Sequence, residues 1–506
     1  YALIGFAGGL TPPTDADARM YHLALPDLYL KAGRIHYIPY ILHSNWPLGN
    51  EMHLMAAMGT AGILAARAIN AGFILASALA VAGLARTRFA PVPSTAAAAV
   101  FISIPIIQSH FLFSNIEPAL AFYELLAFAM FLKWRDTRDV SHAAMCGLFC
   151  GFAMAVKLNG FVFCAALLAL LTASLISGRR HGGAKTALAF IIPAAMPVLP
   201  WIIRSWIWTG NPVWPFFYSV FGGKNWSALN ARDYMFYLTN FFGSPSFSGL
   251  AKSIPGLLTG QLFLNSGIAL IALAPVMFLS KRSRRPALFL LSAAAALFIF
   301  WYVSSPQPRF LYPAIGIACA AAAAAFEAMP RASTVVLLLA LAFHSVPFAS
   351  AYSRNIPFAL GSAAASEFYA GDELFLAYGF VNGLPADSKI MLLWTSEGLF
   401  CPRDYVWGDP FDQGYIRYGS DMSETRRRLE AEGITHVLFH RPGLASKEKL
   451  DRLLRKKLDL ADNDPSTIFS AIPYQNAMIK SGAWKPVFIS PAAEYYIFEI
   501  TAPPDR

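Results

Sequence analysis

The chain has 506 residues, of which 56% are hydrophobic and only 14% are charged, and its mean hydropathy is +0.47. A soluble protein of this length needs more polar surface, so the composition excludes that class and indicates a membrane protein. The net charge of +10 would favour a nucleic-acid partner in a soluble protein, but here the distribution of the cations marks topology. We therefore expect membrane lipids as partners and no nucleic acid.

Apolar segments long enough to cross a bilayer as helices recur up to residue 350. The apolar residues 1–10 are too short to span, so we interpret them as the end of a first membrane helix that begins before Tyr1. The further spans are predicted at residues 65–85, 94–113, 116–133, 142–157, 160–178, 186–208, 260–280, 286–304, 310–328 and 332–350. The sequence thus predicts about eleven membrane crossings.

The arginine and lysine residues between the predicted spans are concentrated in alternate loops. These residues are Arg86, Arg88, Lys133, Arg135, Arg138, Arg179, Arg180, Lys185, Lys281, Arg282, Arg284, Arg285 and Arg331. By the positive-inside rule, the loops that carry them are cytoplasmic. The segment 11–64, the loop 209–259, the turn 305–309 and the residues after 351 then lie on the external side.

The chain is predicted to form two domains. Residues 1–351 form an α-helical polytopic membrane domain that includes the external loops 11–64 and 209–259. Residues 352–506 contain no apolar span and are predicted to form a C-terminal extracytoplasmic α/β domain. The elements predicted outside the membrane are helices at 24–32, 51–65, 422–432 and 446–458, the first two along the membrane surface, and strands at 389–394, 435–440, 486–489 and 495–500.

Ionisable residues close to a membrane are costly, so those that occur there are candidates for function. Seven of them are predicted on the external face: Asp15, Asp17, Glu51, Glu117, Lys157, Arg204 and Arg309. Such a set suits a lipid-phosphate substrate, because cations bind the phosphate and a carboxylate can deprotonate an acceptor hydroxyl. The acceptor oxygen would then attack the anomeric carbon of a sugar while the lipid phosphate departs.

Each candidate also has a structural interpretation. Asp15 and Asp17 follow an apolar segment, where aspartate is common as a turn or N-cap residue, and the cations could be anchors that reach the membrane surface. A divalent-metal site could be supplied by His22, His36, His43 and His53 together with Asp15, Asp17 and Glu51. No metal-ligand spacing is present, so a metal is left open. The acidic residues Glu397, Asp404, Asp409 and Asp412 are interpreted as solvated loop residues.

Several motifs resemble one family. They are Asp17-Ala-Arg-Met-Tyr21-His22-Leu-Ala-Leu-Pro26, Leu30-Lys-Ala-Gly33-Arg-Ile35, Asn45-Trp-Pro47-Leu-Gly-Asn-Glu51-Met, Arg204-Ser-Trp-Ile-Trp-Thr-Gly210-Asn-Pro212-Val-Trp-Pro215-Phe-Phe-Tyr218, Gln307-Pro-Arg309-Phe-Leu-Tyr-Pro313, Trp394-Thr-Ser-Glu-Gly398 and Gly433-Ile-Thr-His-Val437. Through most of its length the chain resembles bacterial membrane glycosyltransferases of the GT-C superfamily, relatives of protein O-mannosyltransferases and of the aminoarabinose transferase that modifies lipid A.

The resemblance implies a GT-C-like fold, a polyprenyl-phosphate-sugar donor and an inverting transfer in the bacterial inner membrane, with the C-terminal domain in the periplasm or outside the cell. It makes Asp17 the preferred general base and Asp15 the reserve. The substrate-binding residues that it implies are Tyr21, His22, Glu51, Glu117, Lys157, Arg204 and Arg309. Many relatives carry two adjacent acidic residues in the first loop, whereas Asp17 is followed by Ala18. This departure weakens the case for a metal role like theirs, and a divalent metal stays open.

Three other functions remain as alternatives. A transporter or flippase of lipid-linked sugars would carry charges near the bilayer midplane and paired broken helices. An oligosaccharyltransferase or ligase would keep the fold and transfer a whole lipid-linked oligosaccharide. An inactive partner-binding relative would tolerate mutation of Asp17. The sugar, hexosyl or pentosyl, and the acceptor, whether glycan, lipid or protein, are not readable from the sequence, and the C-terminal domain is expected to cover the active site or present the acceptor.

Overall fold

The computed structural model describes residues 2–177, 183–240, 267–304, 307–353, 355–362, 364–418, 422–461 and 464–501. The chain forms two compact units, each assembled from three segments. Unit 1 comprises Tyr1–Thr14, Pro47–Ile202 and Phe242–Ser362, and unit 2 comprises Asp15–Trp46, Ile203–Phe241 and Ala363–Arg506. The division into domains at residue 351 stays a prediction, and the predicted span 260–280 and loop 209–259 lie partly outside the described residues.

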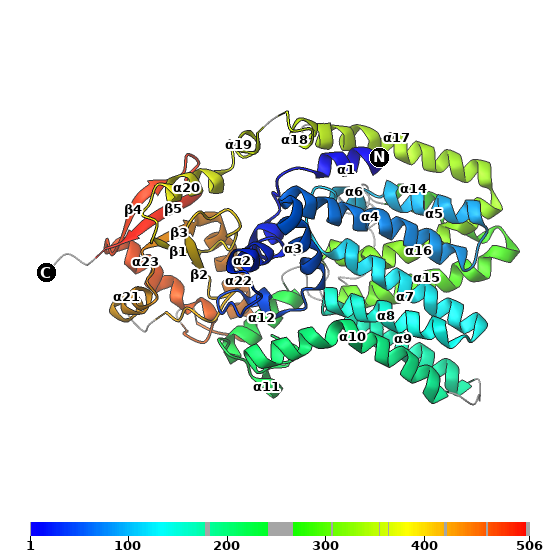
Figure 1. Ribbon diagram of the computed structural model, residues 1–506, viewed down its shortest axis with the longest axis horizontal. Helices are drawn as coiled ribbons and strands as arrows, with labels where there is room; N and C mark the ends of the chain where they lie inside the picture. The colour runs from blue at the N-terminus through cyan, green and yellow to red at the C-terminus, as the bar shows by residue number, and fades with distance from the viewer. Residues whose placement is uncertain are drawn as a thin grey trace. The chain divides into compact units, whose positions relative to one another are not determined.

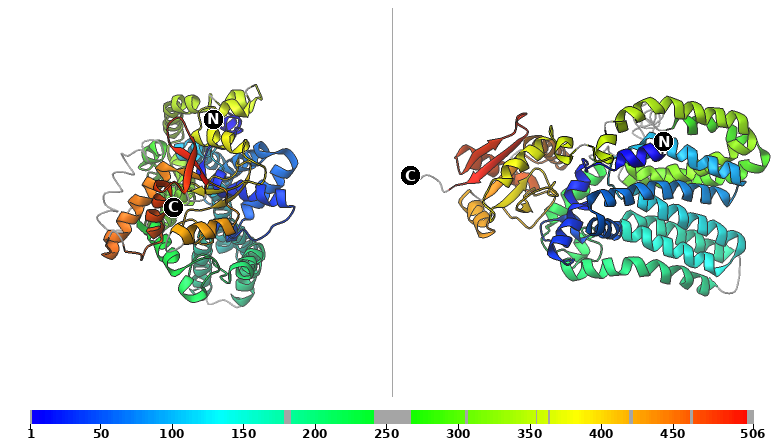
Figure 2. Two further views of the ribbon diagram at one scale, coloured as in Figure 1. Left: turned by 90° about the vertical axis from the view of Figure 1, so that its left-hand side faces the viewer. Right: turned by 45° about the horizontal axis from the view of Figure 1, so that its top comes forward.

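Unit 1 is a bundle of helices that lie side by side in both Figure 1 and Figure 2. Its helices are α1 (Ala2–Gly9), α3 (Gly49–Ala61), α4 (Ile63–Arg86), α5 (Pro91–Ser103), α6 (Pro105–Ser109), α7 (Glu117–Thr137), α8 (Val140–Val156), α9 (Asn159–Ser177), most of α10 (Gly183–Thr209), α14 (Ile268–Leu273), α15 (Lys281–Ser304), α16 (Tyr312–Ala328), α17 (Pro330–Ser353) and α18 (Ile356–Ala359).

Six helices in the described part of the chain are long and apolar enough to cross a membrane. They are Ile63–Arg86, Asn159–Ile176, Gly183–Thr209, Lys281–Ser304, Pro308–Ala328 and Pro330–Ser350. The chain is therefore a multi-pass membrane protein, as the composition indicated. The larger number of about eleven crossings stays a prediction.

Helix α16 lies in the core of unit 1 and contacts α4, α5, α7 and α15. Its alanine run 320–325 is completely buried, and such small side chains let helices approach closely. A similar close approach occurs at Gly147 of α8, where a Cβ atom would lie 2.0 Å from the carbonyl oxygen of Phe190 in α10. The bundle is thus held by tight helix packing at small residues.

The segment predicted as one span at 94–113 is interrupted. Helix α5 ends at Ser103 and α6 begins at Pro105, with Ile104 in an extended conformation between them. Proline lacks the amide hydrogen that would continue the helix and disfavours helical geometry at the preceding residue. The prediction of a continuous helix here was wrong for this reason.

Unit 2 contains a five-stranded sheet and short helices (Figure 1). The strands are β1 (Lys389–Leu393), β2 (Asp404–Trp407), β3 (His436–His440), β4 (Trp484–Ile489) and β5 (Tyr495–Ile500). Their order is β2-β1-β3-β5-β4, with β1 parallel to β2 and β3, and β5 antiparallel to β3 and β4. Ile390 of β1 pairs with His436 of β3, and Val437 of β3 pairs with Phe498 of β5.

The helices of unit 2 come from all three of its segments. They are the π-helix Ala18–His22, α2 (Ala24–Ala32), α11 (Tyr218–Phe221), α12 (Ala228–Asn240), α19 (Ala365–Phe368), α20 (Glu373–Asn382), α21 (Met422–Ala431), α22 (Arg441–Leu458) and α23 (Ile472–Lys480). The predicted helices 24–32, 422–432 and 446–458 and the four predicted strands are confirmed. Strand β2 was missed.

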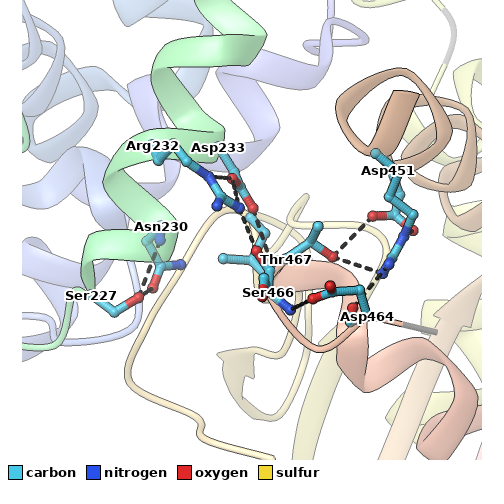
Figure 3. Close-up of polar contacts among 10 residues, drawn as sticks. Ser227, Asn230, Arg232, Asp233, Asp451, Asp464, Ser466 and Thr467 are labelled. Atoms are coloured by element: carbon cyan, nitrogen blue, oxygen red, sulfur yellow. Dashed lines mark hydrogen bonds and ion pairs between the residues drawn. The ribbon is translucent and has the colours of Figure 1, made fainter. Parts of the chain in front are cut away.

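The segment Ile203–Phe241 is bonded to the C-terminal residues within unit 2 (Figure 3). Asp233 of α12 accepts a hydrogen bond from the Ile468 amide at 3.0 Å, and Arg232 donates to the Ser466 carbonyl. Asn230 donates to the Pro410 carbonyl at 2.9 Å. A loop that the sequence assigned to the membrane domain thus folds against the C-terminal residues.

Candidate functional site

A buried ion-pair cluster in unit 1 joins three of the predicted site residues. Lys157 Nζ lies 2.8 Å from Glu117 Oε1, and Arg309 Nε lies 3.5 Å from the same oxygen. The side chains of Glu117, Lys157 and Arg309 are 2%, 12% and 26% exposed. Two cations around one carboxylate leave an excess positive charge, which suits an anionic ligand such as a phosphate.

Helix ends place these three charges. Glu117 is the first residue of α7, where the helix dipole favours a carboxylate. Lys157 is the extended residue between α8 and α9, and Arg309 lies in the short 3-10 helix Pro308–Leu311 before α16. Lys157 Nζ also lies 4.1 Å from the centre of the Phe310 ring, a cation–π contact that holds the ammonium group.

A largely apolar cavity of about 280 Å³ is lined by two members of this cluster, Glu117 and Arg309. Glu117 and Arg309 lie in its wall with aromatic side chains such as Phe163 and Trp301. Glu124, two turns further along α7, also lines the cavity; it is 4% exposed and forms no ion pair with another described residue. The cavity combines a charged group with apolar walls, which is the combination that a lipid phosphate requires.

Arg309 also lines a second cavity of about 280 Å³ with His110, Asn115 and Gln307. Its Nη2 donates to Gln307 Oε1 at 3.1 Å. The His110 ring packs edge-on against Tyr312 at 4.7 Å between ring centres. Because the guanidinium group borders both cavities, it can contact ligand groups in either of them.

Asp15 and Asp17 belong to unit 2, and the structure gives them different surroundings. Asp15 Oδ1 accepts a hydrogen bond from the Ala18 amide at 2.9 Å, which is the capping role that its position allowed. Asp17 has helical backbone angles at the start of the π-helix Ala18–His22 and keeps a partly exposed side chain. Single π-helical turns are rare and frequently lie at functional sites, so Asp17 remains the stronger candidate for catalysis.

Aromatic packing fixes the other motif residues of unit 2. Tyr21 stacks on His43 with ring centres 3.9 Å apart, and His22 is 1% exposed beside it. Arg204, near the end of α10, donates to the Trp46 carbonyl oxygen, and its guanidinium group lies 4.8 Å from the centre of the Trp208 ring. Tyr21 and His22 are therefore buried in an aromatic cluster, which Arg204 joins through its hydrogen bond to Trp46.

Glu51 lies in the first turn of α3 in unit 1 and is 1% exposed. The four histidines of the first loop do not assemble a metal site with it: among the described residues, no three His, Cys, Asp or Glu side chains are grouped closely enough to hold a metal ion. The described residues therefore offer a divalent metal no site with three such ligands.

Arg19 is a central residue of unit 2 that the sequence analysis missed. Its Nη1 lies 2.7 Å from Asp372 Oδ2 and its Nε 2.6 Å from Glu397 Oε2. Burial disfavours the charge of Arg19, but Glu397 and Asp372 outweigh burial and raise the pKa of Arg19. Burial also raises the pKa of Glu397, against the opposing effect of Arg19.

The interpretation of the C-terminal acidic residues as solvated was wrong for three of the four. Asp409 Oδ2 and Asp412 Oδ2 lie 3.3 and 3.6 Å from Lys447 Nζ, and Glu397 pairs with Arg19. Asp404 is exposed. Burial raises the pKa of Asp412 to about 6, with Lys447 opposing it. The partners come from distant helices, which no local pattern reveals.

Two buried charges of unit 1 were also missed. Glu124 lines the cavity beside the ion-pair cluster, and Arg67 of α4 is 3% exposed and donates to Gly9 O, Ser114 Oγ and Leu112 O. Both lie inside long apolar segments, and a lone charge in such a segment is a recognised signal of function or structure. That signal was present in the sequence.

One family model, described as Domain of unknown function (DUF8201), matches residues 50–316. The chain belongs to the DUF8201 family. The match covers α3, α4 and the cluster residues Glu117, Lys157 and Arg309. No curated protein matches the sequence.

The fold of this DUF8201 chain is similar to solved structures of GT-C membrane glycosyltransferases. ArnT from Cupriavidus metallidurans in the apo state gives a TM-score of 0.63 at 14% identity, over 99% of this chain and 96% of that chain. The same protein bound to undecaprenyl phosphate gives 0.58 at 14% identity, over 99% and 97%.

An archaeal oligosaccharyltransferase has the same fold. AglB from Archaeoglobus fulgidus, in complex with an inhibitory peptide and a dolichol-phosphate, gives a TM-score of 0.52 at 14% identity, over all of this chain and 74% of that chain. The predicted GT-C fold of the DUF8201 chain is thereby confirmed.

Proposed function

We propose that this protein is a membrane glycosyltransferase that moves one sugar from a polyprenyl-phosphate donor to a glycan, lipid or protein acceptor outside the cytoplasm. The observation that carries the proposal is the ion-pair cluster of Glu117, Lys157 and Arg309, of which Glu117 and Arg309 lie in the wall of a largely apolar cavity. The GT-C fold supports it, because the similar ArnT structure is described as bound to undecaprenyl phosphate.

The donor phosphate would bind the two cations of the cluster. Lys157 and Arg309 share one carboxylate, so an incoming phosphate can take up their excess positive charge without leaving Glu117 unpaired. The apolar cavity wall accommodates the carbon chain next to the phosphate. As the bond between the sugar and the phosphate breaks, the charge that develops on the phosphate is stabilised by the same cations.

Asp17 would act as the general base. Its partly exposed carboxylate takes the proton of the acceptor hydroxyl while that oxygen attacks the anomeric carbon, so the configuration is inverted. Asp15 is the reserve candidate, and one of its oxygens accepts a hydrogen bond from the Ala18 amide. Tyr21, His22, Glu51 and Arg204 are proposed to contact the substrates.

A comparison of matched aspartate variants tests this assignment. Sugar transfer is measured from radiolabelled undecaprenyl-phosphate sugars by the full chain in lipid nanodiscs, for the wild type, Asp17→Asn and the control Asp15→Asn. We expect a loss of roughly two orders of magnitude or more in Asp17→Asn and a smaller loss in Asp15→Asn. Equal activity of wild type and Asp17→Asn would remove Asp17 from the reaction.

A second candidate function is transfer of a whole oligosaccharide. The observation that favours it is the fold similarity to AglB, an oligosaccharyltransferase. A lipid-linked oligosaccharide would replace the lipid-linked single sugar as donor, with the same base and cations. Donors of increasing glycan length in the same assay distinguish transfer of one sugar from transfer of an oligosaccharide.

We further propose that the C-terminal domain lies on the external side of a bacterial inner membrane.

A further inference from the structure

Within unit 2, the first-loop segment that carries Asp17 is bonded to the C-terminal residues through ion pairs and a hydrogen bond of Arg19. Its guanidinium group lies 2.7 Å from Asp372 Oδ2 and 2.6 Å from Glu397 Oε2. Its carbonyl oxygen accepts a hydrogen bond from the Leu399 amide at 3.0 Å. Arg19, two residues after Asp17, is thus held by both its side chain and its main chain.

Both acidic partners of Arg19 are themselves held in place. Asp372 Oδ1 caps α20 by accepting from the Leu374 amide at 2.9 Å, while Oδ2 binds Arg19. The Glu397 carbonyl oxygen accepts a hydrogen bond from the buried Tyr378 hydroxyl at 2.6 Å. The Arg19 side chain is 13% exposed. A charge pair between partly buried, fixed groups positions a side chain far better than a solvated pair does.

The charges around Arg19 make it difficult to replace. Burial raises the pKa of Glu397, Arg19 lowers it, and the neighbouring Asp372 and Asp15 raise it further. Without the guanidinium group, the unfavourable effects of burial, Asp372 and Asp15 on the charge of Glu397 would no longer be offset by Arg19. Removal of Arg19 is expected to push the segment that carries Asp15 away from Glu397.

The backbone between Asp17 and Arg19 has little freedom. Asp17 immediately precedes the π-helix Ala18–His22, and Ala18 is completely buried. Further along the same turn, Tyr21 is fixed by its stack on His43. The direction of the Asp17 side chain is therefore set by a short turn that is anchored on either side of Met20.

We propose that Arg19 is a positioning residue, and that its double ion pair with Asp372 and Glu397 makes the C-terminal residues part of the structure that orients the Asp17 carboxylate. The inference rests on the proposed role of Asp17 as base. The C-terminal residues then contribute to the rate of transfer through Arg19, without contacting donor or acceptor.

The test combines kinetics with hydrogen exchange on the purified full chain in lipid nanodiscs. In Arg19→Ala, kcat for sugar transfer should fall roughly tenfold to a hundredfold while the donor KM stays within about twofold. Arg19→Lys should recover part of the loss because it restores one charge. The amides of residues 15–23 should exchange faster in Arg19→Ala than in the wild type.

A matched control removes a different buried guanidinium group of unit 2. Arg455 pairs with Asp451 at 2.8 Å, and it also donates hydrogen bonds to C-terminal residues, at Ala461 O, Asp464 O and Thr467 Oγ1. Arg455→Gln should leave both kcat and the exchange of residues 15–23 near wild type. Equal losses in Arg455→Gln and Arg19→Ala would overturn the proposal, because general destabilisation would then explain both.

Three further outcomes distinguish a failure of this inference from a failure of the proposed function. If the amides of residues 15–23 exchange at the wild-type rate in Arg19→Ala, the ion pairs of Arg19 do not hold this segment, and the inference is overturned whatever the activity. Faster exchange with unchanged kcat overturns the positioning role and leaves Arg19 structural. If the wild type transfers no sugar, although residues 15–23 exchange faster in Arg19→Ala, the proposed function is contradicted. The ion pairs of Arg19 would then have no role in catalysis.

Discussion

Removing the charge of Lys157 should lower the free energy of unfolding by about 3 kcal/mol. Lys157 Nζ is 2.8 Å from Glu117 Oε1, and the second cation, Arg309, has its Nε 3.5 Å from the same oxygen. At an effective dielectric constant of about 20, a pair at this distance attracts by roughly 6 kcal/mol, and desolvation of both ions offsets much of that gain. Breaking a buried pair costs about 3–5 kcal/mol, and the remaining Arg309 places this case at the low end.

The assay is a double-mutant cycle with unfolding in detergent as the readout. Lys157→Met and Glu117→Gln should each destabilise the protein, whereas the double variant should recover at least about half of the summed loss, because neither charge is left alone. Lys133→Met, at an exposed position of α7, is the matched control and should stay within about 0.5 kcal/mol. Strictly additive losses would refute this reasoning.

The same variants should change phosphate binding in opposite directions. Lys157→Met removes a cation from the cluster and should weaken binding of undecaprenyl phosphate by roughly tenfold, whereas Glu117→Gln frees both cations and should tighten it. Binding is measured in nanodiscs by competition with a fluorescent farnesyl phosphate. Parallel weakening in both variants would contradict a direct contact between the cations and the phosphate.

Arg67→Met should lower the free energy of unfolding by about 3 kcal/mol, because Arg67 donates three buried or partly buried hydrogen bonds in unit 1; denaturant titration checks this. Gly147→Val should abolish the folded monomer in size-exclusion chromatography, since a Cβ atom would lie 2.0 Å from Phe190 O. Burial raises the pKa of Asp412 to about 6. The free energy of unfolding, measured by denaturant titration at a series of pH values, should therefore fall as the pH rises from about 4 to about 6. Asp412→Asn should flatten that dependence.

The sign of this pH effect follows from the proton balance. Between the unfolded pKa of about 3.9 and the folded value of about 6, the folded chain binds more protons at Asp412 than the unfolded chain does. Stability from this group is therefore present below the lower value and is lost as the pH rises through the higher one. Lys447 stays charged throughout this range, because Asp409 and Asp412 outweigh the effect of burial and raise its pKa. A rise in stability over the same interval would contradict the assignment.

Local pattern was enough to predict the C-terminal elements. The predicted strand at 495–500 coincides with β5, and the predicted helix at 422–432 with α21. Strand β2 escaped because it has four residues and begins with an exposed aspartate, which is unusual for a strand. The break at Ile104 was visible in principle, because Pro105 is incompatible with a continuous helix.

The candidate site was only partly predictable. The sequence placed Glu117, Lys157 and Arg309 at helix ends, but their pairing around one oxygen depends on how α7, α8 and α16 pack. Arg19 was invisible for the same reason, since its partner Asp372 lies 353 residues away along the chain. Glu124 was a different kind of omission, because a lone carboxylate in an apolar helix is a local signal.

Sealed vesicles distinguish transfer from transport. The protein is reconstituted with undecaprenyl-phosphate sugar, labelled in the sugar, and with bacterial lipid, glycan and protein fractions as acceptors. The label is followed in the intact donor and in new products, with undecaprenyl phosphate as the co-product. We expect the label to leave the donor with release of an equal amount of undecaprenyl phosphate, and this activity to be lost in Asp17→Asn. Movement of intact donor between leaflets, with no loss of label from it, would contradict a glycosyltransferase.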